Sequence, residues 1–355
     1  MRRALRHLPH FQPIGDDCTM KKLHLGILDQ SQIGEGRTAH DALHETTKLA
    51  QTAEKLGYSR FWMSEHHASL ALAHSSPEIM IAHVAAATAS IKVGSGGVML
   101  PHYSAYKVAE NFRLLEALHP GRIDLGLGRA PGGMPLATRA LNEGKTYHYD
   151  HYPEQVSDLI DYFHGPLDGD HRFAGLQASP PVETMPEMWL LGSSGESAKF
   201  AARLGTKYGF AQFFGAPGGE EAVRHYKAHF QPSRILDAPH ALIAVLAICA
   251  ETEAEANELA TSTDLFFLRL ERGLELNNLP SVRTALDYPY TEYDLERIKL
   301  ARQRRIVGTP KQVADALREN AERYAADELL IVSPIHDPEA RHRSYALIAE
   351  ACGLA

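Results

Sequence analysis

The feature that most constrains the fold of this 355-residue chain is an alternation, repeated eight times, of short β-rich runs with longer helical patterns. After the first run, Leu49, Ala53 and Leu56 recur at the spacing of one helical face. Eight strands that are each followed by a helix favour a closed (β/α)8 TIM barrel, an α/β fold, over an open sheet. The predicted strands are 23–28, 60–64, 91–100, 122–128, 188–191, 208–212, 242–249 and 328–332.

Two long stretches interrupt this alternation, Ala130–Pro186 and Thr263–Val307. In a barrel such insertions belong to the loops that follow strands, where active sites and lids are built. We therefore expect residues 20–355 to form one barrel domain with insertions in its βα loops. Residues 1–19 are rich in arginine and have no periodicity, so we interpret them as a disordered or non-native extension.

Composition excludes several classes of protein. The net charge of −8 argues against a surface for nucleic acid or anionic membrane, because both require clustered Lys and Arg. Three widely spaced cysteines form no disulfide framework or zinc motif, which predicts a reducing, cytoplasmic location without a metal site. No apolar run has the length of a transmembrane helix. His40 and His44 lack the Glu of a zinc-protease motif, and we interpret them as solvent-exposed.

The second predicted strand ends in titratable residues, Glu65, His66 and His67. Residues at the carboxyl end of a barrel strand face the active site, and histidine suits proton transfer at neutral pH. The alternative is a pair of structural histidines. Adjacent strand residues point to opposite sides, so His66 and His67 are poorly placed to chelate one metal ion.

Glycines mark the next two strands. Gly96 and Gly97 interrupt the third strand, which indicates either room for a flat ring, an unusual peptide geometry or tight packing of a helix. The fourth strand runs into Gly128 and Arg129. The third glycine of a dinucleotide fingerprint is missing here, and Arg129 is interpreted as a fork for phosphate or carboxylate, or as a surface arginine.

The fifth strand leads through Ser193, Ser194 and Ser197 directly into a predicted helix. Backbone N–H groups and hydroxyls at a helix N-terminus form a binding site for phosphate. The alternative is that these serines only cap the helix. The spacing does not fit the G-x-S-x-G motif of a serine hydrolase.

Taken together, these motifs resemble the luciferase-like, flavin-dependent monooxygenase superfamily, and the resemblance extends from Lys21 onward. It implies that His66 is catalytic, with His67 beside it and Glu65 in support. It implies a non-prolyl cis peptide at Gly96-Gly97 against the flavin ring. Gly128 stands where luciferase has a cysteine near that ring, which argues against light emission. The resemblance assigns the phosphate to Arg129, Ser193, Ser194 and Ser197. Its motifs are 61–67, 93–101, 122–133 and 192–197.

The resemblance implies an FMN-dependent monooxygenase that uses reduced FMN and O₂ to oxidise a small organic substrate. The sequence has no nicotinamide fingerprint, so a separate flavin reductase is the expected partner, and the family implies a homodimer. Two alternatives are a hydride-transfer oxidoreductase of the same superfamily that uses deazaflavin F420 or flavin, and a non-catalytic flavin-binding protein. A metal-dependent barrel hydrolase is a further alternative, disfavoured because no spaced set of metal ligands is visible.

Overall fold

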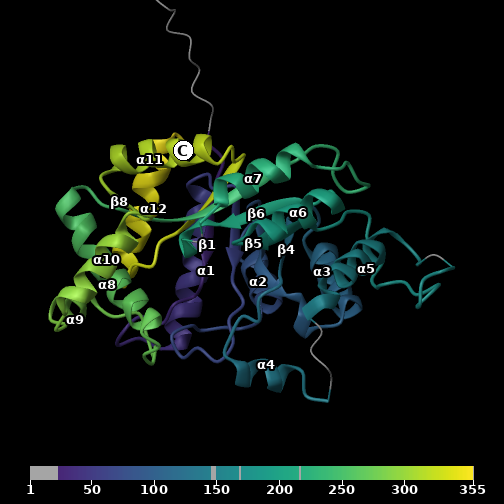
Figure 1. Cartoon of the computed structure of the whole chain (residues 1–355), viewed down its shortest axis with the longest axis horizontal. Coiled ribbons are helices and arrows are strands. Elements are labelled where there is room, and N and C mark those ends of the chain that lie inside the picture. Colours follow the sequence, from purple (N-terminus) through teal and green to yellow (C-terminus); the bar gives the residue numbers. More distant parts are fainter. Residues whose placement is uncertain (1–22, 145–148, 168, 216, 355) are drawn as a thin grey trace, which may run out of the picture.

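The computed structural model of the chain describes residues 23–144, 149–167, 169–215 and 217–354, so the predicted extension 1–19 lies outside the described residues. Eight parallel strands form a closed barrel, because β9 pairs with both β7 and β1 (Figure 1). The predicted (β/α)8 barrel is confirmed. Its strands are β1 Leu25–Asp29, β2 Arg60–Met63, β3 Lys92–Met99, β4 Ile123–Gly128, β5 Glu187–Gly192, β6 Lys207–Ala211, β7 Ala241–Cys249 and β9 Glu328–Val332.

A further short strand, β8 (Ile306–Gly308), lies outside the barrel wall and pairs with the carboxyl end of β7. It belongs to the stretch predicted as the insertion Thr263–Val307. The helix after β7 is longer than the sequence pattern indicated, since it continues to Glu271. The true insertion between that helix and β8 is correspondingly shorter.

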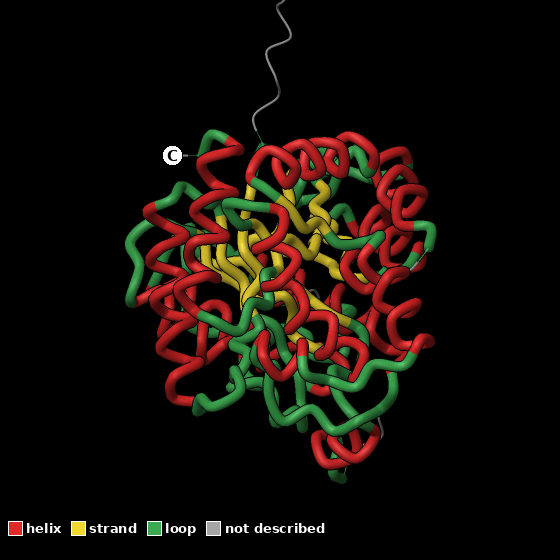
Figure 2. Tube along the Cα trace, turned by 90° about the vertical axis from the view of Figure 1, so that its left-hand side faces the viewer, coloured by secondary structure: helices red, strands yellow, loops and turns green. Residues whose placement is uncertain are grey.

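Helices surround the strands, and the loops gather at one end of the barrel (Figure 2). Polar N-caps begin several of these helices; the Thr38 side chain, for example, accepts a hydrogen bond from the Asp41 N–H. The helices are α1 Ala39–Lys55, α2 Pro77–Ala86, α3 Ala105–Leu118, α4 Pro135–Leu141, α5 Tyr152–His164, α6 Gly195–Leu204, α7 Gly219–Ala228, α8 Glu253–Glu271, α9 Val282–Leu286, α10 Glu292–Arg302, α11 Pro310–Arg323 and α12 Pro338–Cys352, with 3-10 turns η1 Leu100–His102, η2 Tyr149–His151 and η3 Gln212–Phe214.

The amino end of the barrel is closed by buried charge. Arg60, only 3% exposed, forms ion pairs with Asp124 and, through Nε at 2.8 Å, with Glu328 Oε2. Burial raises the pKa of Asp124, and the Arg60 guanidinium acts against that rise. Trp62 Nε1 also donates to Asp124 Oδ2 at 2.7 Å. Above this layer the interior is apolar, with the Trp62 and Trp189 ring centroids 5.4 Å apart. The ligand-accessible space is therefore left at the carboxyl end.

Candidate active site

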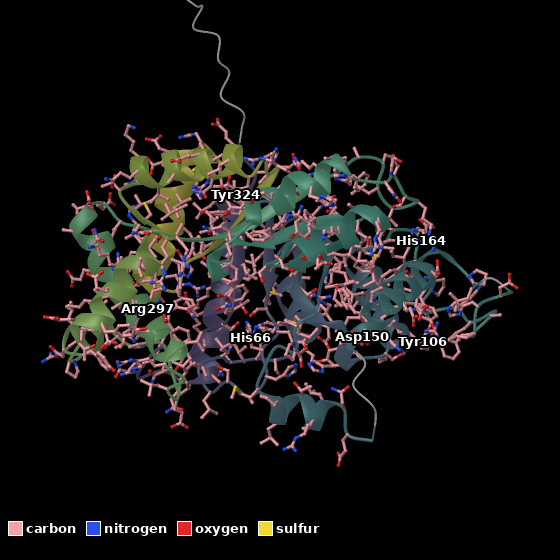
Figure 3. All side chains as sticks on the ribbon, viewed as in Figure 1. His66, Tyr106, Asp150, His164, Arg297 and Tyr324 are labelled. Atoms are coloured by element: carbon pink, nitrogen blue, oxygen red, sulfur yellow. The ribbon has the colours of Figure 1, made fainter. Side chains whose placement is uncertain are left out.

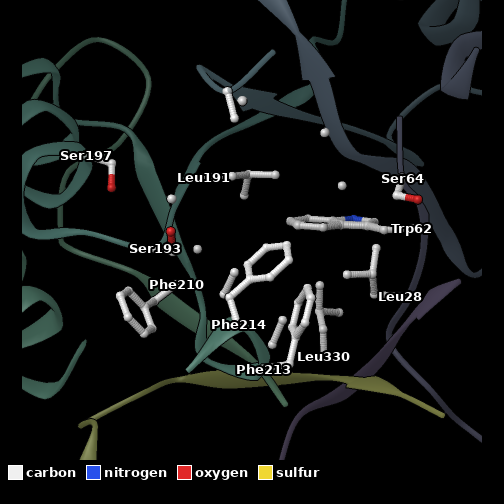
Figure 4. A pocket seen from close by; sticks show the side chains of 18 of the residues that line it. Leu28, Trp62, Ser64, Leu191, Ser193, Ser197, Phe210, Phe213, Phe214 and Leu330 are labelled. Carbon is white, nitrogen blue, oxygen red and sulfur yellow. The ribbon is translucent and has the colours of Figure 1, made fainter. Parts of the chain in front are cut away.

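A cavity of about 320 Å³ lies at the carboxyl ends of the barrel strands, where ligands bind in barrels of this type. Its walls are largely apolar, and Figure 4 shows Trp62, Leu28, Leu330 and Phe213 around it. Eight of the ten predicted site residues line this cavity, although they come from four separate segments of the chain. These eight are His66, Gly96, Gly97, Gly128, Arg129, Ser193, Ser194 and Ser197.

One wall of the cavity is bare backbone at Gly96 and Gly97, and the peptide bond between them is cis, as the resemblance implies. The pairing of β3 with β4 shifts register between Gly96 and Val98. A Cβ on Gly96 would lie 2.6 Å from Leu28 Cδ1, and one on Gly97 would lie 2.6 Å from the Gly126 oxygen. The Gly97 clash is with backbone and leaves no room for a side chain, whereas the Gly96 clash is with the movable end of the Leu28 side chain. Glycine at both positions keeps this wall flat.

His66 presents an imidazole to the cavity. Burial is the main influence and lowers the pKa of His66, Glu65 opposes this, and His74 and His67 lower the pKa further. His74 is itself poorly solvated: both of its ring nitrogens are buried and lack a hydrogen-bond partner among the described residues. At neutral pH His66 is therefore an uncharged imidazole that can accept a proton or a hydrogen bond.

Glu65 and His67 do not line the cavity. Glu65 is fully buried and accepts hydrogen bonds from the Tyr103 hydroxyl at 2.8 Å and the Met99 N–H at 2.9 Å; its carboxylate also lies 2.7 Å from His67 Nε2. Met99 lines the cavity at the end of β3. The structure thus places the Glu65–His67 pair behind the wall, where it ties β2 to β3, while His66 alone of the three faces the cavity.

The opposite end of the cavity is polar and contains the N-terminus of α6. The Ser194 side chain makes no capping bond, and the first helical residue, Gly195, faces open space. Ser197 Oγ donates to the Ser194 oxygen at 2.9 Å. Arg129 lines the cavity together with Ser194 and Ser197 at the start of α6. Helix N–H groups, hydroxyls and a guanidinium together are donors suited to a phosphate.

Several cavity residues were not predicted from the sequence, notably Gln30, Met99, Phe213 and Phe214. Each follows or ends a strand at the carboxyl end of the barrel, and that position was the available signal. Phe213 and Phe214 are in contact, with ring centroids 4.3 Å apart, in η3 directly after β6. Their role as walls depends on how η3 folds back, which no local pattern indicates.

Three further features of the described residues concern an exposed histidine pair, metal ligands and membrane-spanning helices. His40 and His44 are exposed on α1, as predicted, with ring centroids 4.3 Å apart. Within the ranges that the structure describes, no group of three or more His, Cys, Asp or Glu side chains is arranged to hold a metal ion. No helix in the described part of the chain combines the length and the apolarity needed to span a membrane.

Comparison with known proteins finds relatives that match nearly the whole chain. The family model for luciferase-like monooxygenases matches residues 23–327. The protein YwcH of Bacillus subtilis is 52% identical over 327 residues, which cover 92% of this chain and 98% of YwcH. The N-acetyl-S-alkylcysteine monooxygenase of the same organism is 39% identical over 334 residues, covering 93% of this chain and 98% of that enzyme.

Solved structures agree in fold. The crystal structure of apo-MsnO8 superposes with a TM-score of 0.85 at 39% identity, covering 94% of this chain and 99% of MsnO8. The oxygenating constituent of 3,6-diketocamphane monooxygenase from Pseudomonas putida, solved in complex with FMN, has a TM-score of 0.67 at 19% identity, with 92% of this chain and 97% of that chain covered. With the barrel, the cavity and these similarities in place, the chain belongs to the luciferase-like monooxygenase family.

Proposed function

We propose that this protein is an FMN-dependent monooxygenase that oxidises a small organic substrate with reduced flavin and O₂. The observation that carries the proposal is one cavity that joins a flat glycine wall, an uncharged His66 and the open N-terminus of α6. An apolar cavity with a phosphate seat at one end has the chemistry of a flavin mononucleotide site. The FMN complex of the diketocamphane enzyme supports the choice of flavin.

The residues of this chain have separate tasks in the proposed site. Arg129, Ser193, Ser194 and Ser197 would hold the phosphate, and the Gly96–Gly97 backbone would lie against the ring. Bound reduced flavin supplies the electrons with which O₂ is activated. The apolar walls around Trp62 limit the access of water to the reacting atoms. His66, uncharged at neutral pH, would take up or deliver a proton at an imidazole nitrogen.

The test begins with an anaerobic titration of the protein with reduced FMN, followed by rapid mixing with O₂. We expect binding, and we expect a rate of flavin reoxidation that differs from that of free FMN. Product formed from N-acetyl-S-benzylcysteine under ¹⁸O₂ should contain one labelled oxygen; this probe follows the name of the Bacillus subtilis relative. Reoxidation at the rate of free FMN, without labelled product, would contradict the oxygenase proposal. Selective binding of F420 without oxygen consumption would favour hydride transfer instead.

Two partners belong to the same proposal. A separate flavin reductase would deliver reduced FMN, since the sequence contains no nicotinamide fingerprint. NADH alone should then leave FMN oxidised in the presence of the protein, and addition of a reductase should start turnover. A homodimer is also proposed; α2 and α3 leave Ile79, Leu114 and Leu118 more than half exposed, which a second copy would cover. A monomer mass in light scattering would contradict the dimer.

A further inference from the structure

A second cavity, of about 220 Å³, adjoins the first, and we call it the side cavity. Phe213 and Phe214 line both cavities, and Phe214 is 60% exposed. An elongated molecule that occupied both cavities would therefore lie against these two residues. The rest of the side cavity's lining comes from α8, α10 and the turn after α10: Asp264, Phe267, Leu268, Leu270, Glu271, Arg297, Ile298, Ala301, Arg304 and Arg305.

Part of the lining comes from one face of α10 and part from the turn after it. Arg297 and Ala301, four residues apart, lie on one side of α10, and Arg304 lies in the turn that follows the helix. Figure 3 marks Arg297 in this outer helical region and His66 nearer the centre of the molecule. The insertion between β7 and β8 thus brings a row of guanidinium groups beside the active-site cavity.

Most charges in the side cavity neutralise one another. Asp264 forms ion pairs with Arg302 at 2.6 Å and Arg305 at 2.7 Å, and Glu271 forms one with Arg297. These pairs are internal and leave little attraction for a ligand. They also place two carboxylates near the cavity, which disfavours a ligand with more than one negative charge.

Arg304 is different, because within the described residues its guanidinium makes no ion pair. It packs against the Gly215 backbone: a Cβ on Gly215 would lie 2.6 Å from Arg304 Cζ, and Nη1 lies 3.5 Å from the Gly215 oxygen. A second donor in the same cavity, Arg297 Nε, is buried and has no hydrogen-bond partner among these residues. Arg304 is exposed and lines the side cavity, so its guanidinium, which has no acidic partner among the described residues, is available to pair with an anionic group of a ligand there.

We propose that the side cavity binds the carboxylate of an elongated, otherwise apolar substrate, with Arg304 as its charge partner. The apolar part of such a molecule would lie across Phe213 and Phe214, and its far end would reach the main cavity. A carboxylate fits better than a phosphate because it carries one charge and leaves water more readily beside Phe267 and Ile298. The proposal rests on the proposed oxygenase function, since it names the substrate class for the same site.

The experiment compares octanoate with octanamide, which have the same chain length and differ in charge. Dissociation constants are measured by NMR titration at pH 7.5 on the full-length protein with FMN added, so no turnover is needed. We expect wild-type protein to bind octanoate about tenfold more tightly than octanamide. Arg304→Met should weaken octanoate binding about tenfold and leave octanamide binding within about twofold. Arg304→Lys, which keeps the charge and loses the planar fork, should fall between.

Arg283→Met is the matched control, because Arg283 lies on α9 with its side chain 92% exposed and does not line either cavity. It should bind both probes as wild type does. Equal affinity of wild type for octanoate and octanamide, or equal losses of both in Arg304→Met, would overturn the inference. These dissociation constants can be interpreted even when no oxygenation is observed. Conversely, oxygenation of uncharged substrates without any preference for carboxylates would overturn this inference and leave the proposed function standing.

Discussion

At the scale of single residues, His66 differs from Glu65 and His67 in what its side chain reaches. It faces the cavity, whereas the Glu65 carboxylate is occupied by Tyr103, Met99 and His67 behind the wall. Because β2 ends at Met63, strand pairing does not set this division, and the hydrogen bonds of Glu65 to Met99 and Tyr103 hold its side chain away from the cavity. Only His66 of the three is placed to exchange a proton with a ligand in the cavity.

Replacing His66 should therefore impair chemistry and leave the fold intact. We expect His66→Ala to lower substrate-dependent oxygen consumption by about 10²–10⁴-fold, the usual contribution of a positioned acid or base. Reduced FMN should still bind within a few-fold, because the phosphate donors are unchanged. The exposed His44→Ala is the control and should retain full activity. Wild-type turnover in His66→Ala would show that His66 moves no proton in the rate-determining steps.

The acidity of His66 predicts the pH profile. Burial lowers the pKa of His66 below the usual value near 6.5, so its uncharged form persists into mildly acidic solution. Activity that needs the uncharged imidazole should fall as pH drops through this lowered pKa, with a midpoint below 6.5. A profile of oxygen consumption against pH measures the midpoint. The acid limb should disappear in His66→Asn, and a midpoint above 6.5 is incompatible with the buried site.

The space around Gly97 is too small for a side chain, and substitution by alanine tests this. In Gly97→Ala the new Cβ would lie 2.6 Å from the Gly126 oxygen and 2.7 Å from Leu191 Cδ1. We expect a loss of about 1–3 kcal/mol in the free energy of unfolding and a weaker affinity for FMN. Gly169→Ala, where nothing lies within 4 Å of the new Cβ, should change neither quantity. Urea denaturation and flavin fluorescence titration make the comparison.

At the scale of elements, the strands that carry the site are held in place by contacts on the far side of the barrel wall. Glu54 on α1 accepts hydrogen bonds from the backbone N–H groups of Ala89, Ser90 and Ile91, at the entry to β3. Burial alone would raise the pKa of Glu54, but these bonds outweigh it and lower the pKa to about 2. One carboxylate thereby fixes the chain that leads to Gly96 and Gly97.

This lowered pKa predicts how stability depends on pH. Because the folded-state pKa of Glu54 is about 2 and the usual value is 4.5, its contribution is complete above pH 4.5 and is lost as pH falls toward 2. Glu54→Gln should therefore lower the urea midpoint at pH 7 and reduce the decline of that midpoint between pH 5 and pH 3. Glu322→Gln, at an exposed carboxylate, is the control and should follow the wild-type curve. An unchanged pH dependence in Glu54→Gln would refute the assignment.

At the scale of the whole molecule, residues that stabilise the fold and residues that line the cavity lie at opposite ends of the barrel. The amino end carries the Arg60, Asp124 and Glu328 network, and the carboxyl end carries the cavity with His66. The apolar layer of Trp62 and Trp189 lies between them. Substitutions at the amino end should therefore change the free energy of unfolding far more than they change the chemistry.

Arg60→Met tests this separation. It would leave the buried carboxylates of Asp124 and Glu328 without their common partner, at a cost of about 3–5 kcal/mol in the free energy of unfolding. Arg343→Met, which breaks an exposed ion pair with Glu251, should cost less than about 1 kcal/mol. Urea denaturation compares the two variants. A loss from Arg60→Met no larger than that from Arg343→Met would contradict a structural role for the network.

The sequence by itself determined the barrel and most of one cavity wall. The strand–helix alternation is local, because it depends on hydrophobic period and on caps such as Thr38, so the eight barrel strands could be located without long-range contacts. Since all carboxyl ends of a parallel barrel meet at one face, motifs at strand ends such as His66, Gly97 and Arg129 were expected to converge, and they line one cavity.

Only the tertiary structure decided which neighbouring groups face that cavity. The turning of Glu65 and His67 behind the wall follows from hydrogen bonds to Met99 and Tyr103, which are more than thirty residues away in the chain. The meeting of Phe213 and Phe214 with α8 in the side cavity, and the approach of Arg304 to Gly215, bring together segments 50 or more residues apart. Such contacts are set by how insertions pack on the barrel, and local periodicity contains no information about that packing.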